Sequence, residues 1–563
     1  MKSHLLPFVL LFALALPASA ATRAAPTADE LARITAALPA SAPATPAKPR
    51  RLLIFTLNVG YPGHASITHA SAAFTLMGQK TGAYETVGSD DPAVFERESL
   101  RRFDAVFFNN TVGNPFTDPT LRRNLLEFVT GGGGLLGVHG TSAAFTRWPG
   151  AIEDWPEFAS MLGARGVIHK AADEPITIKL DDADHPLNRA FGGSGFPYAN
   201  EFFRFKAPYS RDRVRVLLSI DTAKTDVTTG SERPGLIRAD GDYALAWVRH
   251  YGLGRVFYST IGHSPSVFWD VKILQSYLAA VQFALGDLPA PTTPSAKLTP
   301  AIRAQEKLGW KLGIEAYTFH KFTFFETIEK TAHLGLPFIG GLNFQKVSKE
   351  IPKNFDPNLN DEELLAIRLK LDAHGLRLLT FFIPNIPNDE AGCRRIFEFG
   401  RKMGVETFLS EPKLEALPLI DRFCQEYGIN VALHNHAQKA SPHYWNPEGV
   451  LKACEGRSAR IGACADVGYW LRSGIDPIAG ARLLGARLLI VQMHDLNSVA
   501  ADGHDVPWGT GVGKSAEFLR ELHRLKIKPA MIGLEYSYDW FESLPKIAEC
   551  IQFFNTTTLE LAR

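Results

Sequence analysis

Residues 465–470 of this chain read Ala-Asp-Val-Gly-Tyr-Trp, the end of an apolar run that turns polar at Asp466. Two later runs have the same design, Gln-Met-His-Asp at residues 492–495 and Gly-Leu-Glu-Tyr at residues 533–536. Helix-like segments separate the three runs. Repeated strand-then-helix units of this kind predict a (β/α)₈ barrel, in which the polar strand ends gather on one rim and form the active site.

Eight strand candidates of this type follow one another in the C-terminal half. They lie at residues 312–319, 337–344, 376–383, 405–410, 431–434, 461–465, 488–493 and 530–535. Gly375 and Gly428 end two of the intervening helices, where left-handed geometry is wanted. About 250 residues is the size of one such barrel. We therefore expect a TIM barrel over residues 309–563, with an open doubly wound sheet as the alternative.

The N-terminal half predicts a second α/β domain, over residues 51–288. Its strand candidates lie at residues 52–55, 105–108, 134–138, 214–218, 244–248 and 255–258. Helix-like stretches alternate with the first three strands, which favours a parallel doubly wound sheet like that of flavodoxin. Residues 21–50 and 289–308 are rich in Pro, Ala or Thr, so we expect a flexible spacer and an interdomain linker there.

Composition limits the classes of partner. The chain has 563 residues, too many for one ordinary domain, and 45% of them are hydrophobic and 21% charged. The formal net charge is +1 and there is no long basic run, which argues against nucleic acid or a membrane surface as a partner. A small molecule is the expected partner, and an oligomer is not excluded.

The N-terminus is typical of a secretory signal. Lys2 precedes an apolar core at residues 5–16 and the small-residue cleavage pattern Ala-Ser-Ala at residues 18–20. We expect cleavage, export to a periplasm or beyond, and no membrane insertion of the mature chain; an uncleaved anchor is the alternative. The cysteines are odd in number and form no Cys-x-x-Cys pair, so we expect buried free thiols. They are Cys393, Cys424, Cys454, Cys464 and Cys550.

Polar side chains follow nearly every predicted barrel strand. They are Glu315, His320, Glu411, His434, His436, Asp466, Gln492, His494 and Glu535. So many polar groups on one rim, several of them acids, are unfavourable unless a cation binds among them. The pattern therefore predicts a divalent metal ion: Mn, Zn, Co or Mg.

Two segments carry a family resemblance. Gly-Ala-Cys-Ala-Asp-Val-Gly-Tyr-Trp at residues 462–470 and His-Asp-Val-Pro-Trp-Gly-Thr-Gly at residues 504–511 resemble the xylose-isomerase-like TIM-barrel superfamily. That superfamily includes sugar isomerases and epimerases, inosose dehydratases and the AP-endonuclease-IV group. Its members bind a divalent metal through Glu, Asp, His and Glu at the ends of strands five to eight.

The resemblance implies four metal ligands here: His434, Asp466, Gln492 and Glu535. His434 stands where Glu is usual and Gln492 where His is usual. A neutral amide oxygen is a weaker ligand than imidazole, so His494 or His436 would be able to supply the missing nitrogen.

The same resemblance implies a reaction class. A metal would polarise a carbonyl group or hold two hydroxyl groups, and a rim base would then remove a proton to give an enediolate. That species either collapses to an isomer or epimer, or expels a leaving group from a 3-keto-glycoside. The candidates for proton transfer are His494, Glu411, His320 and His436. Trp470, Trp508 and Trp540 would stack on a sugar, although plain core or rim packing also suits each of them.

Other motifs resemble the ThuA-like trehalose-utilisation family. They are Leu-Gly-Val-His-Gly-Thr-Ser-Ala-Ala-Phe at residues 136–145, Tyr-Ala-Asn-Glu at residues 198–201 and Ile-Gly-His-Ser at residues 261–264. The implied fold is that of class I glutamine amidotransferases. His139 stands where those enzymes place a nucleophilic Cys, and this domain has no cysteine, which excludes thioester chemistry.

The functional residues of this domain would be His139, Glu201 and His263, with His64 nearby. They would bind sugar, transfer protons or hold a metal.

Both halves thus predict an exported carbohydrate enzyme: a metal-dependent sugar isomerase or epimerase, or a 3-keto-glycoside lyase or hydrolase. The alternative is a catalytically degraded periplasmic carbohydrate-binding protein, suggested by His434 and Gln492. A phosphodiesterase of the endonuclease-IV type is disfavoured, because it needs a basic groove.

Overall fold

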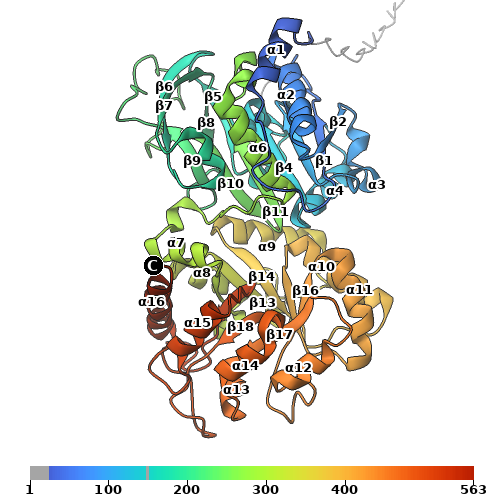
Figure 1. The fold of residues 1–563 in the computed structure, drawn as a ribbon, viewed down its shortest axis with the longest axis vertical. Coiled ribbons are helices and arrows are strands. Elements are labelled where there is room, and N and C mark those ends of the chain that lie inside the picture. Colours follow the sequence, from blue (N-terminus) through green and yellow to red (C-terminus); the bar gives the residue numbers. More distant parts are fainter. Residues whose placement is uncertain (1–23, 148–150) are drawn as a thin grey trace, which may run out of the picture.

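The computed structural model describes residues 24–147 and 151–563, which form two α/β domains stacked end to end (Figure 1). The predicted signal peptide, residues 1–20, lies outside the described residues. None of the helices in the described part of the chain is long and apolar enough to cross a membrane.

The N-terminal domain is built on one mixed sheet of nine strands, in the order β2-β1-β3-β4-β11-β10-β9-β6-β7. The strands are β1 (Arg51–Phe55), β2 (Glu85–Ser89), β3 (Ala105–Asn109), β4 (Gly134–Val138), β6 (Glu174–Leu180), β7 (Phe196–Asn200), β9 (Arg215–Ile220), β10 (Ala244–Tyr251) and β11 (Gly254–Ser259). The first five strands of this order, β2, β1, β3, β4 and β11, pair in parallel with one another. The remaining neighbours, from β11 through β10, β9 and β6 to β7, pair antiparallel. The expected all-parallel sheet is therefore correct for only half of this domain.

Helices cover both faces of this sheet, as a doubly wound fold requires. The helices are α2 (Ser66–Thr81), α3 (Arg97–Leu100), α4 (Pro119–Thr130), α5 (Pro156–Leu162) and α6 (Val271–Leu285). Buried residues of α2 and α6 belong to the hydrophobic cluster on one face, and those of α4 and α5 to the cluster on the other. A small separate ribbon, β5 (Arg165–His169) with β8 (Phe203–Lys206), lies beside them.

The C-terminal domain is a closed barrel of eight parallel strands. Its strands are β12 (Leu312–Ile314), β13 (Phe338–Leu342), β14 (Arg377–Phe382), β15 (Thr407–Ser410), β16 (Asn430–Leu433), β17 (Ile461–Asp466), β18 (Leu488–Met493) and β19 (Met531–Leu534). All eight strand predictions are confirmed. All five cysteines are buried and free, as expected.

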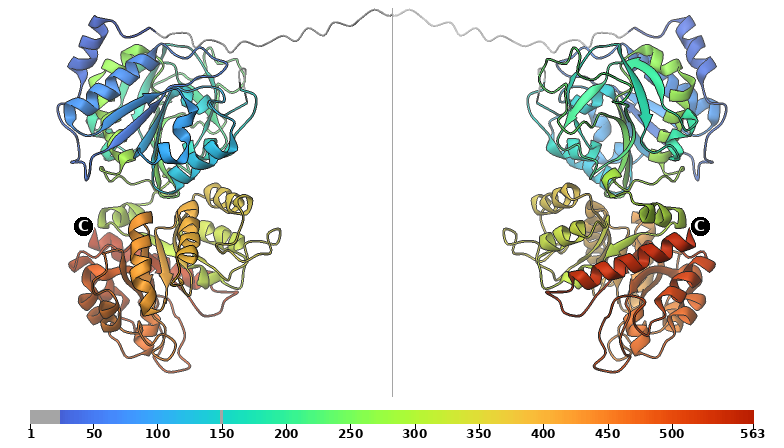
Figure 2. Two further views of the ribbon diagram at one scale, coloured as in Figure 1. Left: turned by 90° about the vertical axis from the view of Figure 1, so that its right-hand side faces the viewer. Right: turned by 90° about the vertical axis from the view of Figure 1, so that its left-hand side faces the viewer.

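Helices surround the barrel, as Figure 2 shows from two sides. They are α8 (Phe324–His333), α9 (Asp361–Ala373), α10 (Glu390–Met403), α11 (Leu417–Tyr427), α12 (Pro447–Ala453), α13 (Val467–Arg472), α14 (Pro477–Leu484), α15 (Ser515–Arg524) and α16 (Leu544–Leu561). A further helix, α7 (Pro300–Leu308), packs against α16, and Gln305 donates to Asn555 at 2.9 Å. The expected linker therefore does not extend to residue 308.

The expected flexible spacer is also wrong for its described part. Residues 28–37 form α1 (Ala28–Ala37), which starts with a reciprocal capping box between Thr27 and Glu30. Ile34 of this helix is fully buried. Farther on, both backbone groups of Ala44 bond the amide of Gln282 in α6, at 2.9 and 2.6 Å. The segment therefore belongs to the N-terminal domain.

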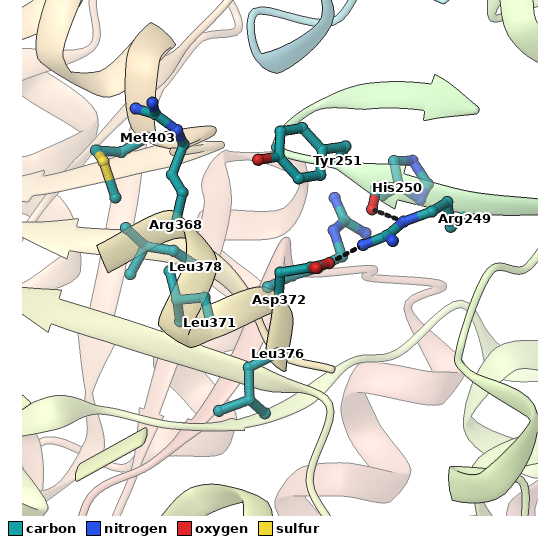
Figure 3. Close-up of a pocket in the computed structure, with 11 residues that line it drawn as sticks. Arg249, His250, Tyr251, Arg368, Leu371, Asp372, Leu376, Leu378 and Met403 are labelled. Atoms are coloured by element: carbon teal, nitrogen blue, oxygen red, sulfur yellow. Dashed lines mark hydrogen bonds and ion pairs between the residues drawn. The ribbon is translucent and has the colours of Figure 1, made fainter. Parts of the chain in front are cut away.

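The two domains meet through a buried polar interface (Figure 3). Arg249 of β10 donates to Asp372 of α9, which also pairs with Arg213 at 3.4 Å. Nearby, Arg368 of α9 pairs with Glu157 of α5 at 3.2 Å. A small cavity of about 40 Å³ lies beside Arg249 and Asp372, and a larger hollow of about 290 Å³ lies beside Glu157 and Arg368. Buried ion pairs of defined geometry fix how the domains dock.

The interface involves the amino-terminal strand ends of both domains. On one side it contains the β10–β11 turn at Gly252, and on the other the loops that lead into β14 and β15 at Gly375 and Gly404. Because parallel strands all run the same way, the carboxyl ends of the barrel strands, and those of β4 and β11, face away from the interface. Strand ends that carry function therefore lie at opposite ends of the molecule.

Candidate metal centre at the barrel rim

Five polar side chains come together at the carboxyl ends of consecutive barrel strands. Glu411 follows β15, His434 follows β16, Asp466 ends β17, His494 follows β18 and Glu535 follows β19. This is the rim on which barrels of this type carry their sites. The structure therefore brings together residues that are 124 positions apart along the sequence, from 411 to 535.

Two histidines converge on one oxygen atom. Nε2 of His434 and Nε2 of His494 each lie 3.8 Å from Oδ2 of Asp466. Nε2 of His494 also lies 3.9 Å from Oε1 of Glu535. Asp466, His494 and Glu535 are all buried, and their ligand atoms lie within 4.8 Å of one another.

A carboxylate behind each histidine fixes its orientation. Nδ1 of His434 lies 3.0 Å from Glu411, and Nδ1 of His494 lies 2.8 Å from Asp505. With Nδ1–H donated to a carboxylate, Nε2 can present its lone pair to the centre, as the histidine ligands of metal ions do.

Backbone geometry holds Asp466 and makes room for the imidazole. Asn435 bonds both backbone groups of Asp466, at 2.9 and 3.0 Å. Oδ1 of Asp466 accepts the Tyr469 amide at the start of α13, which leaves Oδ2 for the histidines. A Cβ atom on Gly468 would lie 3.0 Å from Cγ of His494, so this position must stay small.

The electrostatics of the centre favour a bound cation. Burial lowers the pKa of His494, but the charges of Asp505, Asp466 and Glu535 outweigh it and raise the pKa to about 10. Burial and neighbouring acids raise the pKa of Glu535 to about 8. Nε2 of His494 is buried without a hydrogen-bond partner. Two imidazoles and two carboxylates suit Zn²⁺, Mn²⁺ or Co²⁺, so the residues fit the expected metal.

Gln492 and Glu315 lie at the edge of this centre. Oε1 of Gln492 accepts the Cys464 thiol at 3.5 Å, and Cys464 precedes Asp466 by two residues on the same strand. His494 thus occupies the place between Asp466 and Glu535 where the resemblance assigned Gln492. Burial raises the pKa of Glu315 to about 8, and Thr380 donates to its carboxyl group at 3.3 Å.

A second group of ligand atoms adjoins the first. Glu411, His434 and His436 offer atoms within 4.8 Å of one another, and Nδ1 of His436 also bonds Glu411. Burial raises the pKa of Glu411, but the hydrogen bonds to both histidines lower it to about 2. The same contact raises the pKa of His436 against the effect of burial. A surface cavity of about 400 Å³ opens beside Glu411.

The expected aromatic sugar contacts need correction. Trp470 and Trp508 are 1% and 2% exposed and belong to the hydrophobic core of the barrel domain, so neither ring faces the rim. The aromatic rim is made elsewhere: His320 stacks on Tyr317 with ring centroids 4.3 Å apart, and Trp540 packs edge-on against His320. His320 lies in this aromatic cluster, outside both groups of ligand atoms.

The N-terminal candidates also come together. His139 is fully buried, with Nε2 3.1 Å from Oε1 of Glu201. His263 and His169 lie 3.6 and 3.1 Å from the other oxygen of Glu201. Burial lowers the pKa of His139 despite this carboxylate.

Sequence reasoning missed several residues of these sites. Asp505, the partner of His494, lies in the 504–511 segment that carried the family resemblance, but the sequence alone assigned it no role. His169 lies on an edge ribbon that the strand pattern did not show. Gly468 is part of the Ala465–Trp470 run, but only the structure shows why a glycine stands there: a Cβ atom would lie too close to His494.

Fold and site thus define a two-domain α/β protein whose barrel rim carries groups of residues that could hold a metal ion. Residues 51–284 match the family model ThuA, described as trehalose utilisation. Residues 414–557 match the model of the xylose isomerase-like TIM barrel. The chain therefore combines a ThuA domain with a xylose isomerase-like TIM barrel, as the motifs implied.

Solved structures resemble the two domains separately. An uncharacterized protein from Parabacteroides distasonis is 29% identical over 44% of this chain and 99% of its own, with a TM-score of 0.37. A xylose isomerase-like TIM barrel protein from Mycobacterium smegmatis, solved with magnesium, is 11% identical over 46% of this chain and 99% of its own, with a TM-score of 0.38. No curated protein matches the chain.

Proposed function

We propose that this chain is an exported carbohydrate enzyme whose barrel holds one divalent metal ion and isomerises or epimerises a sugar or keto-sugar. The observation that carries the proposal is the convergence of His434 and His494 on Oδ2 of Asp466, each at 3.8 Å. The match of residues 414–557 to the xylose isomerase-like model supports the substrate class.

The ligands would be His434, His494, Asp466 and Glu535. Two ligand atoms about 2.1 Å from a tetrahedral ion lie ~3.4 Å apart. Three donor-atom pairs here, His434–Asp466, His494–Asp466 and His494–Glu535, are 3.8 to 3.9 Å apart, so movements of a few tenths of an ångström would bring each of these pairs to that separation. His434 lies outside the group of ligand atoms formed by Asp466, His494 and Glu535, so it would move together with its partner Glu411 to join them.

A bound divalent ion would polarise a carbonyl group and make the adjacent C–H bond more acidic. His436 would move the proton. Its ring is 34% exposed, whereas the side chain of His494 is only 7% exposed. Glu411 holds its Nδ1, which leaves Nε2 for the substrate. The aromatic cluster of Tyr317, His320 and Trp540 would pack against the apolar face of the sugar.

The first test is metal content of the chain without residues 1–20, by elemental mass spectrometry. Wild type should carry about one divalent ion per chain at the barrel, and Asp466→Ala should lose it with the fold intact. His320→Ala, a rim histidine outside the ligand groups, is the matched control and should keep the ion. A metal content unaffected by Asp466→Ala would refute the ligand assignment.

The second test is hydrogen exchange on candidate substrates. Ketoses and keto-glycosides incubated with enzyme in D₂O should gain deuterium next to the carbonyl group, followed by NMR. His436→Ala should slow this exchange by roughly 10²- to 10⁴-fold and keep the metal. Exchange followed by loss of the glycosidic group would indicate β-elimination. Sugar binding without any exchange would favour a carbohydrate-binding protein.

A further inference from the structure

A second cluster of ligand atoms lies in the N-terminal domain, outside the barrel. His64, His139, Glu201 and His263 each offer one atom, and these atoms lie within 4.8 Å of one another. The four residues come from separate segments: His64 precedes α2, His139 follows β4, Glu201 follows β7 and His263 lies beyond β11. The rings of the three histidines pack edge to face, with centroids 4.8 to 5.3 Å apart.

The hydrogen bonds of His139 orient its lone pair toward the cluster. Nδ1 lies 3.0 Å from the carbonyl oxygen of Thr260, which can only accept, so Nδ1 carries a proton. In the neutral ring Nε2 then carries a lone pair, and it lies 3.1 Å from Oε1 of Glu201. Two lone pairs face each other there. A cation bound by both atoms turns this repulsion into attraction, and a backbone carbonyl behind Nδ1 is a usual support for a histidine ligand.

The backbone is shaped to let the histidines converge. A Cβ atom on Gly140 would lie 3.1 Å from Cε1 of His64, and one on Gly262 would lie 3.2 Å from Cβ of His139. His139 itself has a φ of 41°, in the left-handed region that residues other than glycine seldom adopt. Backbone strain of this kind is concentrated at functional sites.

We propose that the N-terminal domain holds a divalent metal ion of its own, bound by one ring nitrogen each of His64, His139 and His263 and by Glu201. Three nitrogen donors and one carboxylate suit Zn²⁺ or another late first-row ion, whereas Mg²⁺ and Ca²⁺ prefer all-oxygen sites. Nδ1 of His169 lies 3.1 Å from Oε2 of Glu201, the same oxygen that His263 approaches.

The site would be reached from one side. The side chains of His263 and His169 are 27% and 40% exposed, whereas His139 is fully buried. A small molecule approaching past His263 would offer an oxygen to the ion. The chemistry of the site therefore selects a ligand with a hydroxyl or carbonyl group.

The test uses the whole chain without residues 1–20, in an Asp466→Ala/Glu535→Ala background that removes the barrel centre. After incubation with Zn²⁺ and removal of excess, elemental mass spectrometry should find about one zinc per chain. His139→Ala or His263→Ala should weaken zinc binding by about 100-fold or more. His69→Ala, a buried histidine of the same domain outside the cluster, should leave it unchanged.

Cobalt provides a readout of ligand type. Co²⁺ in the same background should give the visible absorption of a nitrogen-rich site, and His263→Ala should abolish it. Circular dichroism checks that each variant is folded. If His139→Ala does not fold, His263→Ala provides the test, because His263 is partly exposed. Absence of zinc in the folded background protein, or zinc that persists in a folded His263→Ala variant, would overturn the proposal. Either result leaves the barrel assignment untouched, since that centre is tested separately.

Discussion

Asp505→Asn tests whether His494 is a metal ligand. Oδ1 of Asp505 accepts from Nδ1 of His494 at 2.8 Å, and Oδ2 accepts the Ser537 amide at 2.9 Å. Asparagine keeps the volume but has one acceptor and one donor group in place of two acceptors.

The asparagine amide would have two orientations. With its oxygen toward Ser537, its NH₂ group faces Nδ1 of His494, so the histidine proton moves to Nε2 and points at the metal position. With its oxygen toward His494, the ligand tautomer is kept, but the half-buried Ser537 amide loses its acceptor. Metal binding requires the second orientation, at a cost of about 1–3 kcal/mol. Metal affinity should therefore fall about 5- to 150-fold.

The assay is a competition titration of Zn²⁺ or Mn²⁺ against a chelator of known affinity. Asp502→Asn is the matched control, because Asp502 is an exposed residue of the same loop. An affinity for metal that stays within twofold of wild type in Asp505→Asn would refute the role of Asp505 in orienting His494. Equal weakening in Asp502→Asn would mean that the loop, and not this hydrogen bond, matters.

Three further perturbations have defined outcomes. Gly468→Ala places a Cβ atom 3.0 Å from Cγ of His494 and should lower metal affinity at least about tenfold by the same titration, whereas Gly88→Ala, in open space, should not. Asp372→Ala leaves Arg249 and Arg213 unpaired at the domain interface and should destabilise the docked state by about 3–5 kcal/mol in denaturant titrations; Asp502→Ala should cost little. Burial and nearby arginines lower the pKa of His185 from 6.5 to about 4, so the unfolded chain binds more protons between these values. The stability that the neutral ring contributes, on the order of 3 kcal/mol, is complete above pH 6.5 and is lost as pH falls toward 4; His185→Gln should flatten that slope, and an unchanged slope would contradict the assignment.

The barrel could be predicted from sequence because each strand is an apolar run with a polar end. That pattern is local in the sequence, so it can be recognised without knowing which residues pack against each strand. The expected spacer failed for the opposite reason. The Ala- and Pro-rich composition of residues 21–50 hides the Thr27–Glu30 capping box and the burial of Ile34 against distant helices.

The site could be predicted only in part. His434, Asp466 and Glu535 were expected at one rim because they end parallel strands. The sequence does not show which of Gln492 and His494 has its side chain beside Asp466 and Glu535. In the structure the side chain of Gln492 contacts Cys464, two residues before Asp466 on β17, and His494 lies beside the two acids. Trp470 and Trp508 follow polar strand ends or loops in the sequence, as rim residues would. In the structure both rings pack in the hydrophobic core of the barrel domain.

The docking of the domains through their amino-terminal strand ends has a consequence for traffic between the two centres. A molecule released at one centre enters bulk water before it can reach the other, because the barrel rim and the His139 cluster lie at opposite ends of the molecule. Any compound that both centres handle must therefore survive free in solution. It is open to capture by an added scavenging enzyme, and the covalent fusion keeps the two domains in equal amounts without direct transfer between them.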